Sequence, residues 1–229
     1  PLRANPPHPR SIWYTQGKRV GIDRRCGGFS RSFELIRENP PNLPHPRPIY
    51  HKKDLNMLIE FNGIRPRLAA GVYVAPTAVI IGDVTIGPGA NIWFGAVIRG
   101  DAGPITIGAR VSVQDNVVIH VNGHDPTVLE DDVLVGHAAV LEGCHIGAYT
   151  MVGMRATVLS GARVGAECLI AAGAVVREQS NFPPRTLIAG VPAAAKGPLT
   201  PALEARLRRG PQHYQEYAQL YRERARILE

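Results

Sequence analysis

Cysteine is scarce in this sequence of 229 residues, which contains only Cys26, Cys144 and Cys168. A small and odd number of cysteines argues against a disulfide framework and favours a reducing compartment. Long apolar runs are also missing, because no stretch approaches the ~20 residues that a helix needs to span a bilayer. These two absences exclude a disulfide-rich scaffold and a protein that crosses membranes with helices.

Acidic residues are few in the first 53 positions, which hold 11 lysines and arginines against 3 aspartates and glutamates. This basic, proline-rich arm predicts an anionic lipid surface or an acidic partner protein as its target. Nucleic acid is not an expected partner, because the arm contains no recognisable nucleic-acid-binding module. Within the arm, a helical stripe over residues 29–38 predicts either a strap packed on a neighbour or an amphipathic segment on a membrane.

An aliphatic residue recurs every six positions through the middle of the chain, with two steps of nine. The marked residues are Val74, Ile80, Ile86, Ile92, Ile98, Ile107, Val113, Ile119, Val128, Leu134, Val140, Ile146, Val152, Val158, Val164, Ile170 and Val176. A fixed short period predicts a solenoid over residues 72–178, with three hexads per triangular coil and parallel pairing between coils. The marked residues then form the interior column. Glycines directly after several of them, such as Gly87, Gly108, Gly147 and Gly165, predict turns that need permissive dihedrals.

The C-terminal segment predicts helical structure. Thr200 is a plausible N-cap with Pro201 at the first helical position. We expect this helix to end near Arg209, because Gly210 should break it and Pro211 should start a second helix. The second helix carries an apolar, aromatic stripe of Tyr214, Tyr217, Ala218 and Tyr221, which we expect to pack on the solenoid of its own or an adjacent subunit. The chain then divides into an arm (1–53), a β-helix (54–195) and a helical segment (196–229).

The repeat also places the residues that could carry chemistry. Arg99, His120 and Glu142 are expected on one face in adjacent coils, and Gln114, Asp115 and His137 on a different face. His120 and Glu142 can therefore converge, whereas His137 of the same chain points elsewhere. In a threefold trimer, His137 of one subunit could meet His120 and Glu142 of the next. Two imidazoles and a carboxylate, with a fourth position left for water, are the pattern of a catalytic zinc site.

Simpler interpretations exist for the same residues. Glu142 could be a solvated or ion-paired carboxylate. Arg99 and Asp101 could form an interface salt bridge, since Arg–carboxylate pairs across subunits are common. The other histidines, His45, His51, His124, His145 and His213, show no such register and are expected to be surface or hydrogen-bonded side chains.

Several runs together resemble the gamma-class carbonic anhydrase family over residues 70–195. They are IIGD (80–83), VIRGD (97–101), VQDNVVIH (113–120), VGH (135–137), LEGC (141–144) and GVP (190–192), together with Ile92-Trp93 and Gly153-Met154. In addition, GIDRRC (21–26) and the tyrosine-rich final helix resemble the family members attached to mitochondrial respiratory complex I.

The resemblance implies a left-handed parallel β-helix that forms a trimer and holds Zn²⁺ at its subunit interfaces through three histidines. His120 and His137 match two of these ligands, and Glu142 stands at the position of the third. Arg99, Asp101, Gln114 and Asp115 match the interface pair and the polar residues of the active site. A carboxylate in place of a neutral histidine adds negative charge to the metal and should raise the pKa of its bound water.

For function, the resemblance implies a peripheral location on the matrix side of the mitochondrial inner membrane. The expected partners are other gamma carbonic anhydrase-like chains in a heterotrimer, and the membrane-arm subunits and anionic lipid that the basic arm would contact. A mainly structural role is expected because of Glu142. The alternative is an active zinc enzyme that interconverts CO2 and bicarbonate. A hexapeptide-repeat acyltransferase, with a histidine as general base, is a third and weaker hypothesis.

Overall fold

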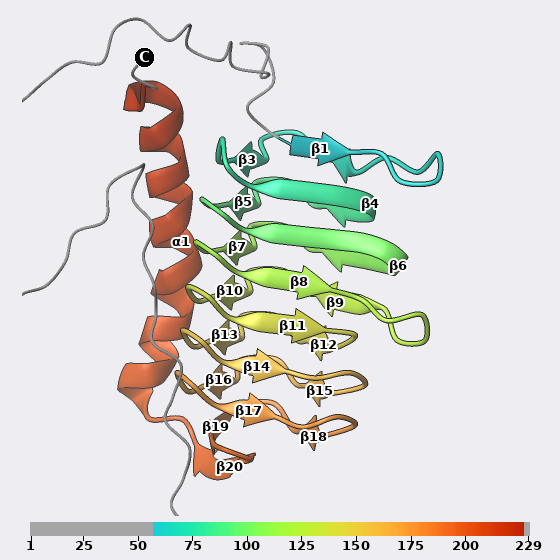
Figure 1. The fold of residues 1–229 in the computed structure, drawn as a ribbon. Coiled ribbons are helices and arrows are strands. Elements are labelled where there is room, and N and C mark those ends of the chain that lie inside the picture. The colour runs from blue at the N-terminus through green and yellow to red at the C-terminus, as the bar shows by residue number, and fades with distance from the viewer. Residues whose placement is uncertain (1–56, 227–229) are drawn as a thin grey trace, which may run out of the picture. The chain divides into compact units, whose positions relative to one another are not determined.

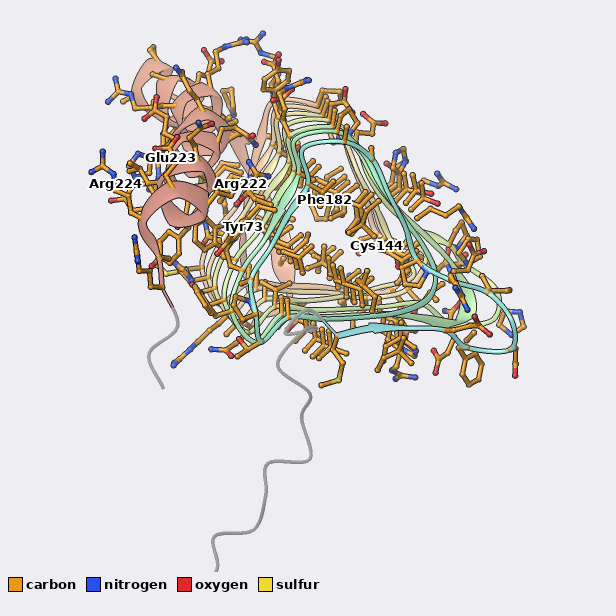
Figure 2. The ribbon with its side chains drawn as sticks, turned by 90° about the horizontal axis from the view of Figure 1, so that it is seen from above. Tyr73, Cys144, Phe182, Arg222, Glu223 and Arg224 are labelled. Carbon is orange, nitrogen blue, oxygen red and sulfur yellow. The ribbon has the colours of Figure 1, made fainter. Side chains whose placement is uncertain are left out.

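A computed structural model describes residues 57–226 of the chain. The basic arm, its helical stripe at 29–38, Cys26, His45 and His51 lie outside these residues. The described residues form a parallel β-helix of about seven turns, triangular in cross-section, with one long helix along one side (Figures 1 and 2). The fold class predicted from the hexad repeat, a parallel solenoid with a C-terminal helix, is confirmed.

Three stacks of short strands make the three faces of the triangle. The first face contains β1 (Met57–Ile59), the starts of β4 (Val79–Ile86) and β6 (Val97–Ile107), then β8 (Val118–His120), β11 (Val140–Glu142), β14 (Thr157–Val158) and β17 (Val175–Val176). The second face contains β2 (Arg67–Leu68), the ends of β4 and β6, then β9 (Thr127–Leu129), β12 (His145–Ile146), β15 (Arg163–Val164) and β18 (Asn181–Phe182). The third face contains β3 (Tyr73–Val74), β5 (Asn91–Ile92), β7 (Ser112–Val113), β10 (Leu134–Val135), β13 (Met151–Val152), β16 (Leu169–Ile170) and β19 (Thr186–Gly190). A last strand, β20 (Ala193–Pro198), pairs antiparallel with β19.

The interior column is aliphatic, as the repeat predicted, but its phase is shifted by one residue from Leu129 to Leu141. Val128, Leu134 and Val140 were expected inside and are not, because the buried interior residues of these strands are their neighbours Leu129, Val135 and Leu141. The loop after β8 takes ten residues from Ile119 to Leu129 instead of nine, and the chain returns to phase with a step of five, from Leu141 to Ile146. Val140 is consequently 39% exposed on the outside of the first face.

The glycines that follow the interior residues serve close packing between coils, which corrects the expectation of permissive dihedrals. Gly87, Gly108, Gly147 and Gly165 are not among the residues with positive φ. A Cβ added at Gly147 would lie 2.5 Å from the backbone nitrogen of Ala166 in the next coil. Side chains are excluded here because the coils stack too closely, not because the backbone is left-handed.

The C-terminal segment forms one helix, α1 (Pro201–Arg224), and the prediction of two shorter helices is wrong. Its start is as predicted, since the Leu203 amide donates to the Thr200 hydroxyl at 3.4 Å and Pro201 opens the first turn. Pro211 lies inside the helix and is buried, and Gly210 faces Leu134 and Met151 so closely that a Cβ would lie about 3.0 Å from the Leu134 side chain. Packing against the third face therefore holds together a helix that the local sequence would interrupt.

Helix α1 runs along the third face from the last coils towards the first, as Figure 1 shows. Near its start, Arg185 pairs with Glu204 at 2.6 Å and Arg208 with Glu167 at 3.3 Å. Near its end, Arg222 donates to the Gly71 carbonyl at 2.6 Å. Of the predicted aromatic stripe, Tyr214 and Tyr221 pack on Trp93 of the same chain, whereas Tyr217 is 44% exposed. Within residues 57–226, no helix is long and apolar enough to cross a membrane.

Buried thiols give a first testable prediction. Cys144 points into the triangular interior (Figure 2), and burial raises the pKa of its thiol to about 12. At pH 8 only about one Cys144 side chain in ten thousand is then a thiolate, which is the reactive form. We expect N-ethylmaleimide to label Cys144 only after denaturation, as read by mass spectrometry of tryptic peptides. Labelling within minutes in the native protein would contradict this burial.

Candidate functional site

Arg99, His120 and Glu142 form an outward-facing ladder on the first face. The parallel register pairs Arg99 with His120 and His120 with Glu142, in β6, β8 and β11. Each residue comes directly after an interior aliphatic residue, so each occupies the same position in its coil. The imidazole Nδ1 of His120 lies 3.5 Å from Glu142 Oε1. Among residues 57–226, Glu142 forms no ion pair with an arginine, and its polar neighbour is the His120 imidazole.

Asp101 fixes the other side of His120. Its carboxylate lies 3.0 Å from His120 Nε2 and also pairs with the Arg99 guanidinium, so the Arg99–Asp101 salt bridge forms within one chain. Burial opposes ionisation of Asp101, but the hydrogen bonds from His120 and Arg99 outweigh it and hold the pKa of Asp101 below its usual value. Asp101 therefore stays ionised and orients the imidazole, as carboxylates commonly orient metal-binding histidines.

His137 lies at a different corner, after β10, together with Gln114 and Asp115. Its Nδ1 is 2.7 Å from Asp115 Oδ2, and its backbone amide donates to Gln114 Oε1 at 3.0 Å. The Tyr214 hydroxyl of α1 lies 3.5 Å from His137 Nε2, at the long limit of a hydrogen bond. Burial, with nearby Asp115, raises the pKa of Tyr214, so this hydroxyl remains protonated. Sequence analysis did not select Tyr214, because its helical spacing explained it as packing.

The two groups do not meet within one chain. Among residues 57–226 there is no cluster of three or more His, Cys, Asp or Glu side chains that could hold a metal ion. His120 and Glu142 are together on the first face, and His137 stands alone with its carboxylate partner. This separation is what the hexad register predicted, because residues 57–226 of one chain do not bring His137 to His120 and Glu142.

The donor atoms fit a zinc ion in their chemistry. With Nδ1 held by Asp115, His137 presents Nε2, which has only the long 3.5 Å contact with the Tyr214 hydroxyl among the described residues. With Nε2 held by Asp101, His120 presents Nδ1 on the side of Glu142. Two imidazole nitrogens and a carboxylate oxygen are an accepted ligand set for zinc, and each imidazole has its orienting carboxylate.

The remaining described histidines have other environments. His145 Nε2 lies 2.8 Å from Glu130 Oε1 on the second face, and the same carboxylate accepts from the Ala148 amide. His213 packs against Tyr217 with the rings tilted and their centroids 4.6 Å apart, and His124 is exposed in the loop after β8. The expectation of surface or hydrogen-bonded side chains is confirmed for these three.

A stripe of outward β-branched side chains runs beside the His120 ladder. This valine stripe consists of Val79, Val97, Val118, Val140, Thr157 and Val175, which the strand register stacks in consecutive coils. Val118 and Val140 are 38% and 39% exposed. They stand two residues before His120 and Glu142, so the candidate ligands border an apolar surface, as residues at a subunit contact would.

Comparison with known proteins identifies the fold family of this β-helix. A bacterial transferase hexapeptide family model of six repeats matches residues 65–100 and 143–178. A solved hexapeptide transferase family protein from Anaplasma phagocytophilum is 32% identical, with a TM-score of 0.70, over 72% of this chain and 98% of that chain. The chain is thus a hexapeptide-repeat β-helix protein.

Sequence relatives among curated proteins identify a narrower family within the hexapeptide-repeat proteins. Carbonic anhydrase of Geobacillus kaustophilus is 36% identical over 166 residues, which are 72% of this chain and 91% of that protein. Mitochondrial gamma carbonic anhydrase 1 of Arabidopsis thaliana is 38% identical over 155 residues, 65% of this chain. The chain belongs to the gamma carbonic anhydrase family. It spans 56% of the length of the Arabidopsis relative.

Proposed function

We propose that this chain is a gamma carbonic anhydrase-like subunit of mitochondrial complex I, the NADH:ubiquinone oxidoreductase. It would form part of a trimer on the matrix side of the membrane arm, with a mainly structural role. The proposal of a structural role depends on Glu142. This residue pairs in register with His120, at a position where the family resemblance leads us to expect a histidine. The mitochondrial names of the Arabidopsis relatives support the location.

Trimer formation is supported by the separation of the ligands and by the valine stripe. A second subunit that covers Val118 and Val140 would bury apolar surface directly beside His120 and Glu142. The same contact would allow the neighbour's His137 to approach them. In a heterotrimer this chain could also lend its His137 to a partner that carries two histidines, and so contribute half of one complete site and half of one altered site.

Within such a site, zinc would supply a Lewis acid that lowers the pKa of a coordinated water, to about 7 in carbonic anhydrases. His120, His137 and Glu142 would hold the ion. Asp101 and Asp115 would keep the two imidazoles in orientation, Arg99 would hold Asp101, and Gln114 would orient the reactant. Glu142 contributes a negative charge to the ligand set, which weakens the effect of the metal on the water pKa.

A second candidate function is an active carbonic anhydrase that interconverts CO2 and bicarbonate at the trimer interfaces. Its support is that all of the proposed site residues except the Glu142 position match the family pattern. A stopped-flow CO2 hydration assay on the native trimer, with zinc supplied, separates the two functions. The structural proposal expects the background rate from sites built of His120, Glu142 and His137, and a rate well above background would favour the enzyme.

Docking by the basic arm is tested by deleting residues 1–50. We expect the shortened chain to trimerise but to be lost from complex I, because the arm carries the basic excess that would contact anionic lipid and membrane subunits. Blue native electrophoresis reads the association, and size-exclusion chromatography of the shortened chain controls for folding. Unchanged association and assembly would refute this part of the proposal.

A further inference from the structure

A groove of about 780 Å³ lies between α1 and the third face. Its floor includes the small residues Gly136, Gly153 and Ala171, which stand in consecutive coils at the position that Gln114 holds one coil earlier. Its wall on the helix side is also small, with Ala202 and Ala205. Small residues on both sides leave open space within the range of small-molecule sites. The helix residues that border the groove, 202–214, extend over about 18 Å.

The charge of the groove has one sign. No aspartate or glutamate lines it, while Arg206, Arg209 and His213 do. Within the part of the chain that the structure describes, Arg206 and Arg209 form no ion pair. Their neighbour Arg208 is paired with Glu167, away from the groove lining. Two unpaired guanidinium groups beside an apolar floor favour an anion with an apolar body.

The other end of the groove is lined by the polar side chains of Gln114, His137 and Tyr214 and by the flexible apolar side chain of Met154. Gln114 is only 4% exposed, and its Oε1 accepts from the His137 amide. Its Nε2 makes no hydrogen bond to another residue of the described range, and Gln114 lines the groove. Met154 lines the same end and is 52% exposed, which is unusual for a large apolar side chain.

We propose that this groove binds an amphiphilic organic anion, an unbranched alkyl chain that ends in a carboxylate. The carboxylate lies against Arg206 and Arg209, and the chain extends over Gly153 and Ala171 towards Met154. Binding is non-covalent and requires neither a metal ion nor the carbonic anhydrase reaction, although His137 and Gln114 of the proposed zinc site line one end of the same groove.

Isothermal titration calorimetry of the full-length protein with decanoate tests the proposal. We expect saturable binding of one decanoate per chain. Acetate, which has the charge without the chain, and decanol, which has the chain without the charge, should bind at least about tenfold more weakly. The double variant Arg206→Gln/Arg209→Gln should weaken decanoate binding by at least about tenfold, because it removes both charge-assisted hydrogen bonds.

Matched variants separate the groove from general effects of charge and folding. Arg208→Gln removes a neighbouring arginine that does not line the groove and should leave binding unchanged. Ala171→Leu should fill the floor and abolish binding, whereas Ala148→Leu, at a half-exposed position on another part of the β-helix, should not. Absence of saturable binding, equal binding of decanol, or equal losses in Arg208→Gln and the double variant would overturn the proposal. A groove filled by a second copy of the chain would give the first of these results.

Discussion

Replacing Leu141 with alanine should lower the free energy of unfolding by about 2–5 kcal/mol, the usual cost of truncating a fully buried leucine. Leu141 is 0% exposed and contributes to the interior column. Val140→Ala, one residue earlier, should change the same free energy by no more than about 1 kcal/mol, because Val140 faces outward. Chemical denaturation of both variants, followed by circular dichroism, measures the difference.

Comparing these two variants tests whether Leu141 or Val140 faces the interior of the β-helix. A strict six-residue count places Val140 inside, and under that register the two effects would be reversed. Leu129→Ala and Val128→Ala form a second matched pair on another face, away from the valine stripe. Agreement between the pairs would separate an effect on the core from any effect of Val140 on subunit association.

Glu142→His should replace the carboxylate of the proposed metal site with the histidine ligand that the family resemblance implies. A neutral imidazole removes a negative charge from the metal and strengthens its effect on the water pKa. We expect zinc content and the rate of CO2 hydration of the trimer to rise, the rate by at least about tenfold. Elemental analysis and stopped-flow assays measure the two quantities.

Two further variants control this experiment. His137→Ala in the Glu142→His background should return the rate to background, because the third ligand would be lost. Glu142→Gln removes the charge without supplying an imidazole and should not produce the gain. An unchanged zinc content and rate in Glu142→His would mean that Glu142 is not what limits the site, and the argument for a structural role from this residue would fail.

The period of the sequence was sufficient to predict the β-helix, because a triangular coil buries one aliphatic side chain in each hexad. It was not sufficient to fix the phase after Ile119. Adjacent pairs such as Val128-Leu129 and Val140-Leu141 are both apolar, so composition cannot tell which member is buried. The ten-residue step that decides it depends on the loop after β8. Likewise, Gly210 and Pro211 indicate a break in isolation, and only packing on Leu134 and Met151 explains the continuous helix.

The candidate site was predictable where it depends on register. Arg99, His120 and Glu142 follow interior residues of consecutive coils, and counting hexads brought them together even though the count used Val140 in place of Leu141. The side chains that contact each histidine were harder to predict from the sequence. Asp101 reaches His120 from a bend inside β6, and Tyr214 reaches His137 from a helix 77 residues later. Neither contact can be predicted from a local sequence pattern.

The antiparallel return of β20 has a consequence for the solution behaviour of the protein. A stack of parallel strands presents the same hydrogen-bonding edge at every coil, so one molecule could in principle continue the next and grow into a filament. β20 occupies the edge of β19 with reversed polarity, and Ala193 at its start packs against the interior column. A six-residue strand thereby closes the hydrogen-bonding edge of the third face, whereas β17 and β18 remain the last strands of the other two faces among the described residues, so end-to-end pairing is disfavoured at one side of the triangle.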